Sequence, residues 1–205
     1  MSALPKADTR LLTLADIADL RAYERERDEF RNHVIALKRR RRIAVGPFVT
    51  LLFENRDTIR FQIQEMARVE KLISDEQIES ELRAYTPLIP EPGHLSATLF
   101  IELTSEDLLR EWLPKLVGIE RSMVIEIAAE GVEPIRCSVD PGHESQLTRE
   151  DITASVHYVN WTFTAEQAAA FAEHGGSVRC DHPEYPHVTE FTPENRAELS
   201  LDLGS

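Results

Sequence analysis

One stretch concentrates side chains that could bind a ligand: FENRDTIRFQIQEM, residues 53–66. Its candidate ligand-binding residues are Glu54, Asn55, Arg56, Arg60 and Gln64. An arginine fork with adjacent amides can hold a carboxylate or phosphate through two parallel hydrogen bonds. If residues 57–73 are helical, the start of that helix adds free N–H groups for an anion. The alternatives are a solvated helix face with i,i+4 pairs, or an interface with the acidic second half of the chain.

A second candidate ligand-binding surface is the alternating stretch HYVNWTF, residues 157–163. Alternation predicts a strand, and it places His157, Val159 and Trp161 on one face. An imidazole and an indole beside apolar groups are typical of pocket walls, which combine aromatic side chains with few polar ones. The N-terminal helices could equally cover this face, so both interpretations stay open.

A third group could bind a metal ion: Cys137, His143, Cys180, His182 and His187. Thiolate and imidazole are preferred ligands of zinc and iron, and a tetrahedral Cys2His2 site would need the two segments to meet. No CxxC or HxxxH spacing supports this hypothesis. Alternatively, each cysteine is a small core residue and the histidines occupy surface turns. Cys180 and His182 are two residues apart on one predicted strand, which disfavours a catalytic dyad.

Several enzyme classes lack their signatures in this sequence. It contains no G-x-S-x-G nucleophile elbow, no P-loop and no G-x-G-x-x-G motif. It also has no Glu-x-x-His pair of the kind that diiron helices carry. The chain is therefore not expected to be a rubrerythrin-like diiron oxidase.

Periodicity and capping residues predict the elements that position these groups. Helical spacing with N-cap residues predicts helices over residues 13–42, 58–73, 74–85, 106–116 and 165–174. Alternation and β-branched runs predict strands within residues 43–53, 97–103, 122–127, 133–139, 154–163, 177–180 and 187–191. The tail, residues 193–203, is interpreted as a helical turn followed by an edge strand.

The order of these elements predicts an α+β fold. Residues 97–139 and 154–191 each follow the order strand, capped helix, strand, strand. We interpret them as two βαββ-like units that build one mixed sheet, with a helical N-terminal part packed on it. Chance similarity between two amphipathic segments is the alternative interpretation. The Pro-rich segment 86–94 predicts a boundary between residues 1–86 and residues 94–205. One integrated domain is the alternative.

Composition narrows the compartment and the partners. The 205 residues are 42% hydrophobic and 29% charged, and no apolar run approaches a membrane span. The first residues lack the apolar stretch of a secretory signal, which predicts a cytoplasmic protein. The formal charge is −13, with 16 Lys and Arg against 15 Asp and Glu up to Thr86, then 7 against 21.

This charge asymmetry bears on binding. The acidic half disfavours nucleic acid and membrane partners. The basic run KRRRR, residues 38–42, is interpreted as a helix end whose cations face the acidic half of the same chain or of a twin subunit. A homo-oligomer is therefore one expectation. The less favoured alternative for this run is a contact with nucleic acid or with an acidic surface of another protein.

The pattern GP-x5-FENRDT-x3-QIQEM, together with HYVNWTF and DHPEYPH, resembles a bacterial family of about this length known only as a domain of unknown function. Members of that family look to be often encoded beside rubrerythrin-like iron proteins and iron–sulfur oxidoreductases. The resemblance therefore implies a redox or peroxide-stress setting, with a redox or iron protein as partner.

Two function classes follow from these observations. The first is a non-catalytic accessory or binding protein of a redox system, which uses the FENRDTIRFQIQEM and HYVNWTF segments for recognition. The second is a small metalloprotein or metal-dependent enzyme that uses the cysteine and histidine group with zinc or iron. The sequence leaves the ligand and any reaction open.

Overall fold

The computed structural model describes residues 11–139 and 152–204. The chain divides into two compact units, and each is formed from two separate stretches. A helical unit comprises residues 1–36 and 55–89, and a sheet unit comprises residues 37–54 and 90–205. The division therefore differs from two consecutive parts, because residues 37–54 belong with the later part of the chain. Residues 37–54 join the sheet unit, where the strand at residues 49–53 pairs with residues 97–101.

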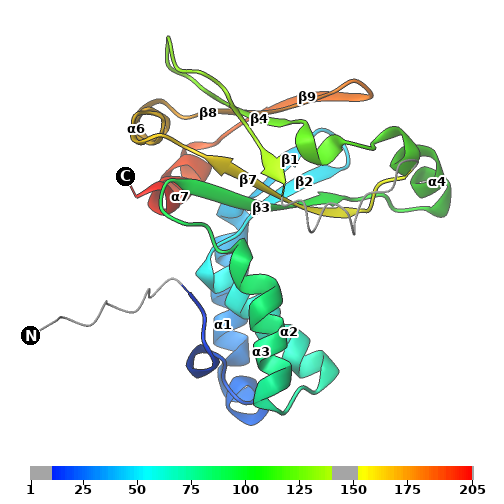
Figure 1. The fold of residues 1–205 in the computed structure, drawn as a ribbon, viewed down its shortest axis with the longest axis vertical. Coiled ribbons are helices and arrows are strands. Elements are labelled where there is room, and N and C mark those ends of the chain that lie inside the picture. Colours follow the sequence, from blue (N-terminus) through cyan, green and yellow to red (C-terminus); the bar gives the residue numbers. More distant parts are fainter. Residues whose placement is uncertain (1–10, 140–151, 205) are drawn as a thin grey trace, which may run out of the picture. The chain divides into compact units, whose positions relative to one another are not determined.

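Figure 1 shows the helices of the helical unit, and capping residues mark the start of several of them. Its elements are η1 (Leu14–Asp16), α1 (Leu20–Arg41, whose last turn lies in the sheet unit), α2 (Arg56–Glu70), α3 (Asp75–Tyr85) and η2 (Thr86–Leu88). Asn55 accepts the Thr58 N–H and caps α2, and Ser74 with Gln77 forms the predicted capping box of α3.

The first helix starts later than the sequence predicts. Thr13 and Asp16 cap only the short η1 turn, because the Asp16 carboxylate accepts the Thr13 N–H at 2.8 Å. A second cap follows at Asp19, whose Oδ1 accepts the Ala22 N–H at 2.9 Å. Residues 17–19 therefore form a linking segment between η1 and α1.

The sheet unit contains two antiparallel sheets. Sheet A has the order β1 (Arg42–Val45), β2 (Val49–Phe53), β3 (His94–Ile101), β7 (Val156–Thr162), β6 (Ser138–Val139). Sheet B has the order β5 (Ile135–Arg136), β4 (Met123–Ile127), β8 (Gly176–His182), β9 (Tyr185–Glu190). The other elements are α4 (Glu106–Lys115), η3 (Ile119–Arg121), α6 (Ala165–His174) and α7 (Pro193–Leu203). Figure 1 shows α6 and α7 at one end of this unit and α4 at the other.

The α+β class is confirmed, but the single mixed sheet is wrong. Every strand pairing among the described residues is antiparallel, and each predicted βαββ-like unit sends its first strand to sheet A and its second strand to sheet B. The two βαββ-like segments, residues 97–139 and 154–191, meet at the centre of both sheets, where β3 pairs with β7 and β4 pairs with β8. The predicted strand 133–139 divides at Cys137, so that it contributes β5 to sheet B and β6 to sheet A.

The core of the sheet unit lies between the inward faces of its two sheets. Leu51, Leu99 and Val159 from sheet A join Ile125 and Val178 from sheet B in one buried cluster. Burial of this apolar area is the main term that stabilises the unit. The tail forms the helix α7, not a turn and an edge strand, because Thr192 and Pro193 start a helix whose later turns enter this cluster.

The end of the basic run, residues 40–42, pairs with acids of its own chain within the sheet unit, as the helix-end interpretation allows. Arg40 Nε donates to Glu198 at 2.8 Å, and Arg42 lies within 2.5 Å of Glu102. Among residues 11–139 and 152–204, no helix is both long and apolar enough to cross a membrane.

Candidate functional site

The polar face of α2 holds the segment before α1 in place. Arg56 forms an ion pair with Asp16. Arg60 Nε donates to the Asp16 carbonyl at 2.8 Å, and its Nη2 donates to Glu26 at 2.9 Å. The Arg60 guanidinium also lies over the Phe30 ring, 4.6 Å from its centroid. These arginines therefore stabilise the path of the chain across α2.

Gln64 completes this attachment. Its Oε1 accepts the Ala18 N–H at 2.7 Å, and its Nε2 donates to the Ala18 carbonyl at 3.2 Å. The residue is fully buried, so both halves of its amide are used away from water. Residues 16–18 are consequently tied to α2 by side-chain bonds.

A neighbouring cluster on the same helices was not identified from the sequence. Glu65 accepts hydrogen bonds from the Tyr23 hydroxyl at 2.7 Å and from Arg27 Nε and Nη2 at 2.8 and 3.0 Å. The bond to Arg27 is the main reason that the pKa of Glu65 falls to about 2. Burial, and then the bond to Glu65, raise the pKa of Tyr23. The i,i+4 spacing of Tyr23 and Arg27 indicates that the two side chains lie on one face of α1, where they can share a partner.

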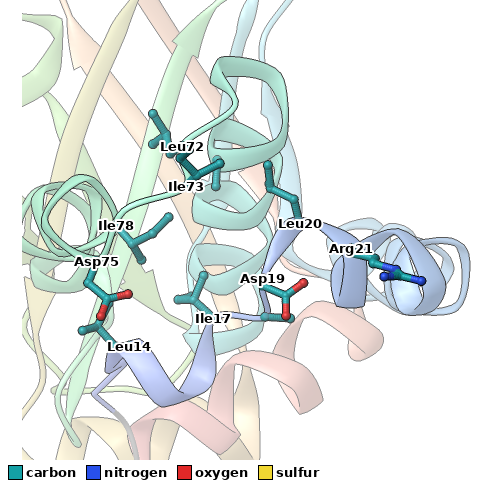
Figure 2. Close-up of a pocket in the computed structure, with 11 residues that line it drawn as sticks. Leu14, Ile17, Asp19, Leu20, Arg21, Leu72, Ile73, Asp75 and Ile78 are labelled. Atoms are coloured by element: carbon teal, nitrogen blue, oxygen red, sulfur yellow. The ribbon is translucent and has the colours of Figure 1, made fainter.

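A pocket opens beside the segment that α2 holds. Its volume is about 250 Å³. It is lined by Leu14, Ile17, Ala18, Asp19, Leu20, Arg21, Ala67, Leu72, Ile73, Asp75 and Ile78. Figure 2 shows the aliphatic side chains from the two walls directed into one space. All of these residues belong to the helical unit, so the pocket is a feature of that unit alone.

One residue at the pocket exposes an unusual amount of apolar surface. Ile73 is 84% exposed, although it directly precedes the Ser74 cap. An apolar residue at this position usually packs against the fourth residue of the helix, here Ile78. Such packing would cover Ile73, whereas its side chain is left open at the pocket. The sequence does place an apolar residue before the Ser74 cap, but that pattern predicts packing of Ile73 on Ile78 and not an exposed side chain.

Acidic groups dominate the charged part of the rim. Asp19 and Asp75 are both exposed lining residues. Arg21 also contributes to the lining, but Figure 2 shows its guanidinium extending away from the cavity. A cation of a bound molecule would meet carboxylates at this rim.

A second, more open hollow adjoins the first at Leu14. Its volume is about 500 Å³, and it is lined by Thr13, Leu14, Ala15, Glu79, Leu82 and Arg83. Helix α3 contributes residues to both hollows. Together they form a depression along α3, which we call the α3 groove.

The other residues of the predicted ligand-binding set occupy structural positions. Glu54, which belongs to the sheet unit, is buried and accepts a hydrogen bond from Thr98 Oγ1 at 2.6 Å. Asn55 caps α2 through its Oδ1, 3.0 Å from the Thr58 nitrogen. Neither residue lines the α3 groove; Arg56, Arg60 and Gln64 also lie outside its lining, behind its wall.

His157 and Trp161 are buried in the sheet unit. His157 Nε2 lies 2.8 Å from Thr153 Oγ1 and 2.9 Å from the Ala154 carbonyl. Trp161 is fully buried, with its ring centroid 5.5 Å from that of Phe53. The predicted face of the strand is therefore the face that packs into the core of this unit.

The described members of the cysteine and histidine group make separate contacts with the fold, although Cys180 and His187 are paired residues of β8 and β9. Cys137 Sγ donates to the Glu120 carbonyl at 3.1 Å, and burial raises the pKa of each of the two thiols to about 11. His182 uses both ring nitrogens: Nε2 lies 3.1 Å from the Val117 carbonyl, and Nδ1 accepts the Glu184 N–H at 3.3 Å. The His187 ring packs against Tyr185.

His143 lies outside the described residues. Among the residues that the structure describes, no three His, Cys, Asp or Glu side chains are grouped so that they could hold a metal ion.

Comparison with known proteins identifies the family. Residues 11–203 match the model of the family described as "Protein of unknown function (DUF3501)", and the chain belongs to this family. A crystal structure of a novel protein of unknown function from Burkholderia pseudomallei K96243 is similar at 35% identity and a TM-score of 0.84. The match covers 94% of this chain and 98% of that one. A search of curated proteins finds no match. The resemblance noted in the sequence is thus confirmed at the level of the family.

Proposed function

We propose that this member of the DUF3501 family is a non-catalytic accessory protein that binds a partner through the α3 groove. The observation that carries the proposal is the aliphatic pocket of about 250 Å³ with Ile73 84% exposed at its edge. Exposed apolar surface around a concave site is typical of recognition surfaces.

Preorganisation of the pocket wall supports the proposal. Arg56, Arg60 and Gln64 bind the Asp16–Ala18 segment through hydrogen bonds that do not involve the pocket interior. A wall that is already ordered loses little further conformational entropy when it binds. The polar residues that the sequence marks as ligand contacts would then act as positioning residues for an apolar site.

The chemistry of the groove favours binding over catalysis. The lining of the enclosed pocket contains carboxylates and one guanidinium among aliphatic side chains, and it contains neither a thiol nor an imidazole. The buried thiols of the sheet unit, with pKa values raised to about 11, would be poor nucleophiles at neutral pH. In the redox or peroxide-stress setting that the resemblance implies, this protein would recognise a redox or iron protein and leave the chemistry to it.

A pair of matched variants tests the proposal. Tagged protein is incubated with an extract of the cells that naturally produce it, and retained proteins are identified by mass spectrometry. Ile73→Ser removes an exposed lining residue, whereas Val69→Ser removes an aliphatic residue that is 67% exposed and outside the lining. We expect one or more proteins to be retained by the wild type and Val69→Ser and lost with Ile73→Ser.

Circular dichroism and thermal melting of both variants serve as the folding control. Equal retention by the wild type and Ile73→Ser, with both folded, would contradict a role for the groove in binding.

A further inference from the structure

The shape of the α3 groove does not suit a compact small molecule, because its enclosed part is small and its open part extends along the helix. Its enclosed part, at about 250 Å³, is below the ~300–1,000 Å³ typical of small-molecule sites. The open part continues past Leu14 and provides about 500 Å³ more, but without enclosure. A ligand that buries apolar groups in the first part and extends along the second would match this shape.

The spacing of the α3 residues sets the length of such a ligand. Asp75 and Ile78 line the enclosed part, and Glu79, Leu82 and Arg83 line the open part. From Asp75 to Arg83 the helix axis rises by roughly 12 Å, at about 1.5 Å per residue. Two turns of a partner helix cover this distance and present apolar residues at i, i+4 and i+7.

The rim determines the charge that the ligand should carry. Asp19, Asp75 and Glu79 supply carboxylates along the groove. The Arg21 guanidinium extends away from the cavity, and Arg83 Nη1 lies 3.8 Å from Glu79 Oε2. Asp75 is also exposed in the first turn of α3, where a cation from a partner can reach it. A lysine or arginine beside the apolar anchor therefore complements the enclosed end.

From these observations we infer that the α3 groove binds an amphipathic helical segment of a partner protein, with aliphatic anchors at i, i+4 and i+7 and a lysine or arginine next to the first anchor. The inference rests on the proposed function and specifies its partner. The first anchor enters the enclosed pocket against Ile17, Ile73 and Ile78, and the adjacent cation lies beside Asp19 and Asp75.

Synthetic peptides of this design test the inference. The parent peptide is a capped 14-residue helix (roughly four turns) with leucine at the anchors and lysine at the flanking positions. One matched peptide replaces the flanking lysines by glutamate, and another replaces the anchoring leucines by serine. Affinity is measured by fluorescence anisotropy, and the site is located by NMR shifts of isoleucine methyl groups in the full chain.

We expect the lysine peptide to bind and to shift Ile17, Ile73 and Ile78. Ile73→Ser should weaken it by roughly tenfold, since it removes one buried aliphatic contact, and Val69→Ser should not. Asp75→Asn should weaken it by a few fold and reduce its salt dependence. Glu76→Gln removes a carboxylate from the same helical turn, outside the lining, and is the control.

Three outcomes would overturn the inference: no binding of the lysine peptide, binding that is insensitive to Ile73→Ser, or equal affinity for the lysine and glutamate peptides. A neutral aliphatic alcohol such as 1-hexanol provides a separate arm. If the alcohol shifts Ile17 and Ile78 while no peptide binds, the pocket takes a small apolar ligand and the helical partner is wrong. The proposed function itself fails only through the Ile73→Ser retention experiment.

Discussion

The guanidinium of Arg41 binds the carboxylate of Asp202 through two parallel hydrogen bonds, at 2.7 and 3.0 Å, although 160 residues separate them in the sequence. Arg41 is only 1% exposed, and its Nε also donates to Glu198 at 3.0 Å. Its Nη1 lies 3.3 Å from the Glu54 carbonyl. One buried cation therefore joins the end of α1 to α7 and to the end of β2.

Arg41→Met should destabilise the protein by about 3–5 kcal/mol, because the largely buried Asp202 loses its cation and Glu198 keeps only its pair with Arg40. Arg39→Met, at an exposed position two residues earlier, should change the free energy of unfolding by less than about 0.5 kcal/mol. Urea denaturation measures both. Combining Arg41→Met with Asp202→Leu should recover part of the loss. A small effect of Arg41→Met alone would show that the ion pairs contribute little.

Gln64→Met should destabilise the helical unit by about 1–3 kcal/mol, since it leaves the Ala18 N–H and carbonyl without their partner. Gln62→Met, at an exposed position on the same helix, is the matched control and should be nearly neutral. Amide hydrogen exchange adds a local measurement, because the Ala18 amide should exchange faster in Gln64→Met. An unchanged exchange rate would contradict the attachment of this segment to α2.

Glu65 should make stability depend on acidity in a defined pH window. Its pKa is lowered from an ordinary value of 4.5 to about 2, chiefly by Arg27. The unfolded chain therefore takes up this proton before the folded chain does, and the stabilisation is present above about pH 4.5 and is lost as the pH falls toward 2. We expect the stability difference between the wild type and Glu65→Gln to shrink across that window.

The comparison uses urea denaturation at a series of pH values, with Glu29→Gln as a variant that removes one exposed carboxylate of α1. A difference between the wild type and Glu65→Gln that stays constant from pH 5 to pH 2 would show that the bonds from Tyr23 and Arg27 do not stabilise the charged carboxylate.

The two thiols should be unreactive in the folded protein. Burial raises the pKa of Cys137 and of Cys180 to about 11, so the thiolate fraction at pH 8 is roughly a hundredfold below that of a free cysteine. We expect alkylation by iodoacetamide to be slow in native protein and fast after unfolding in urea. Fast modification of the native protein would indicate that the thiols reach solvent.

Oxidation should not join these cysteines either. Met123 lies between them, because it pairs with Cys180 on one side and its carbonyl accepts the Cys137 N–H on the other. The Cα atoms of the two cysteines are therefore about two strand spacings apart, at roughly 4.8 Å each. This distance exceeds the ~7 Å between Cα atoms beyond which a disulfide cannot form. Diamide treatment followed by mass spectrometry checks this.

Elemental analysis tests the metalloprotein alternative, which would gain support from stoichiometric zinc or iron that disappears in Cys180→Ser.

Local patterns in the sequence were sufficient for most elements. The Ser74 and Gln77 capping box, the β-branched runs and the repeated order of strand and helix predict α3, the strands and the α+β class, because these signals act between residues close in the chain. The family signature in residues 46–66 is likewise a property of the sequence alone.

Tertiary structure decided how the polar groups are used and where an open site remains. Gln64 is the same residue at the same position on α2 whether its amide binds a ligand or Ala18, so the sequence does not distinguish the two roles. The contact with Ala18, 46 positions earlier, depends on how η1 and α1 pass over α2. The α3 groove depends on the same packing, since Ile73 is apolar in either case and only the neighbouring chain decides whether it is covered. Residue type and spacing thus specify local conformation, whereas long-range packing determines which side chains are satisfied internally and which are left for a partner.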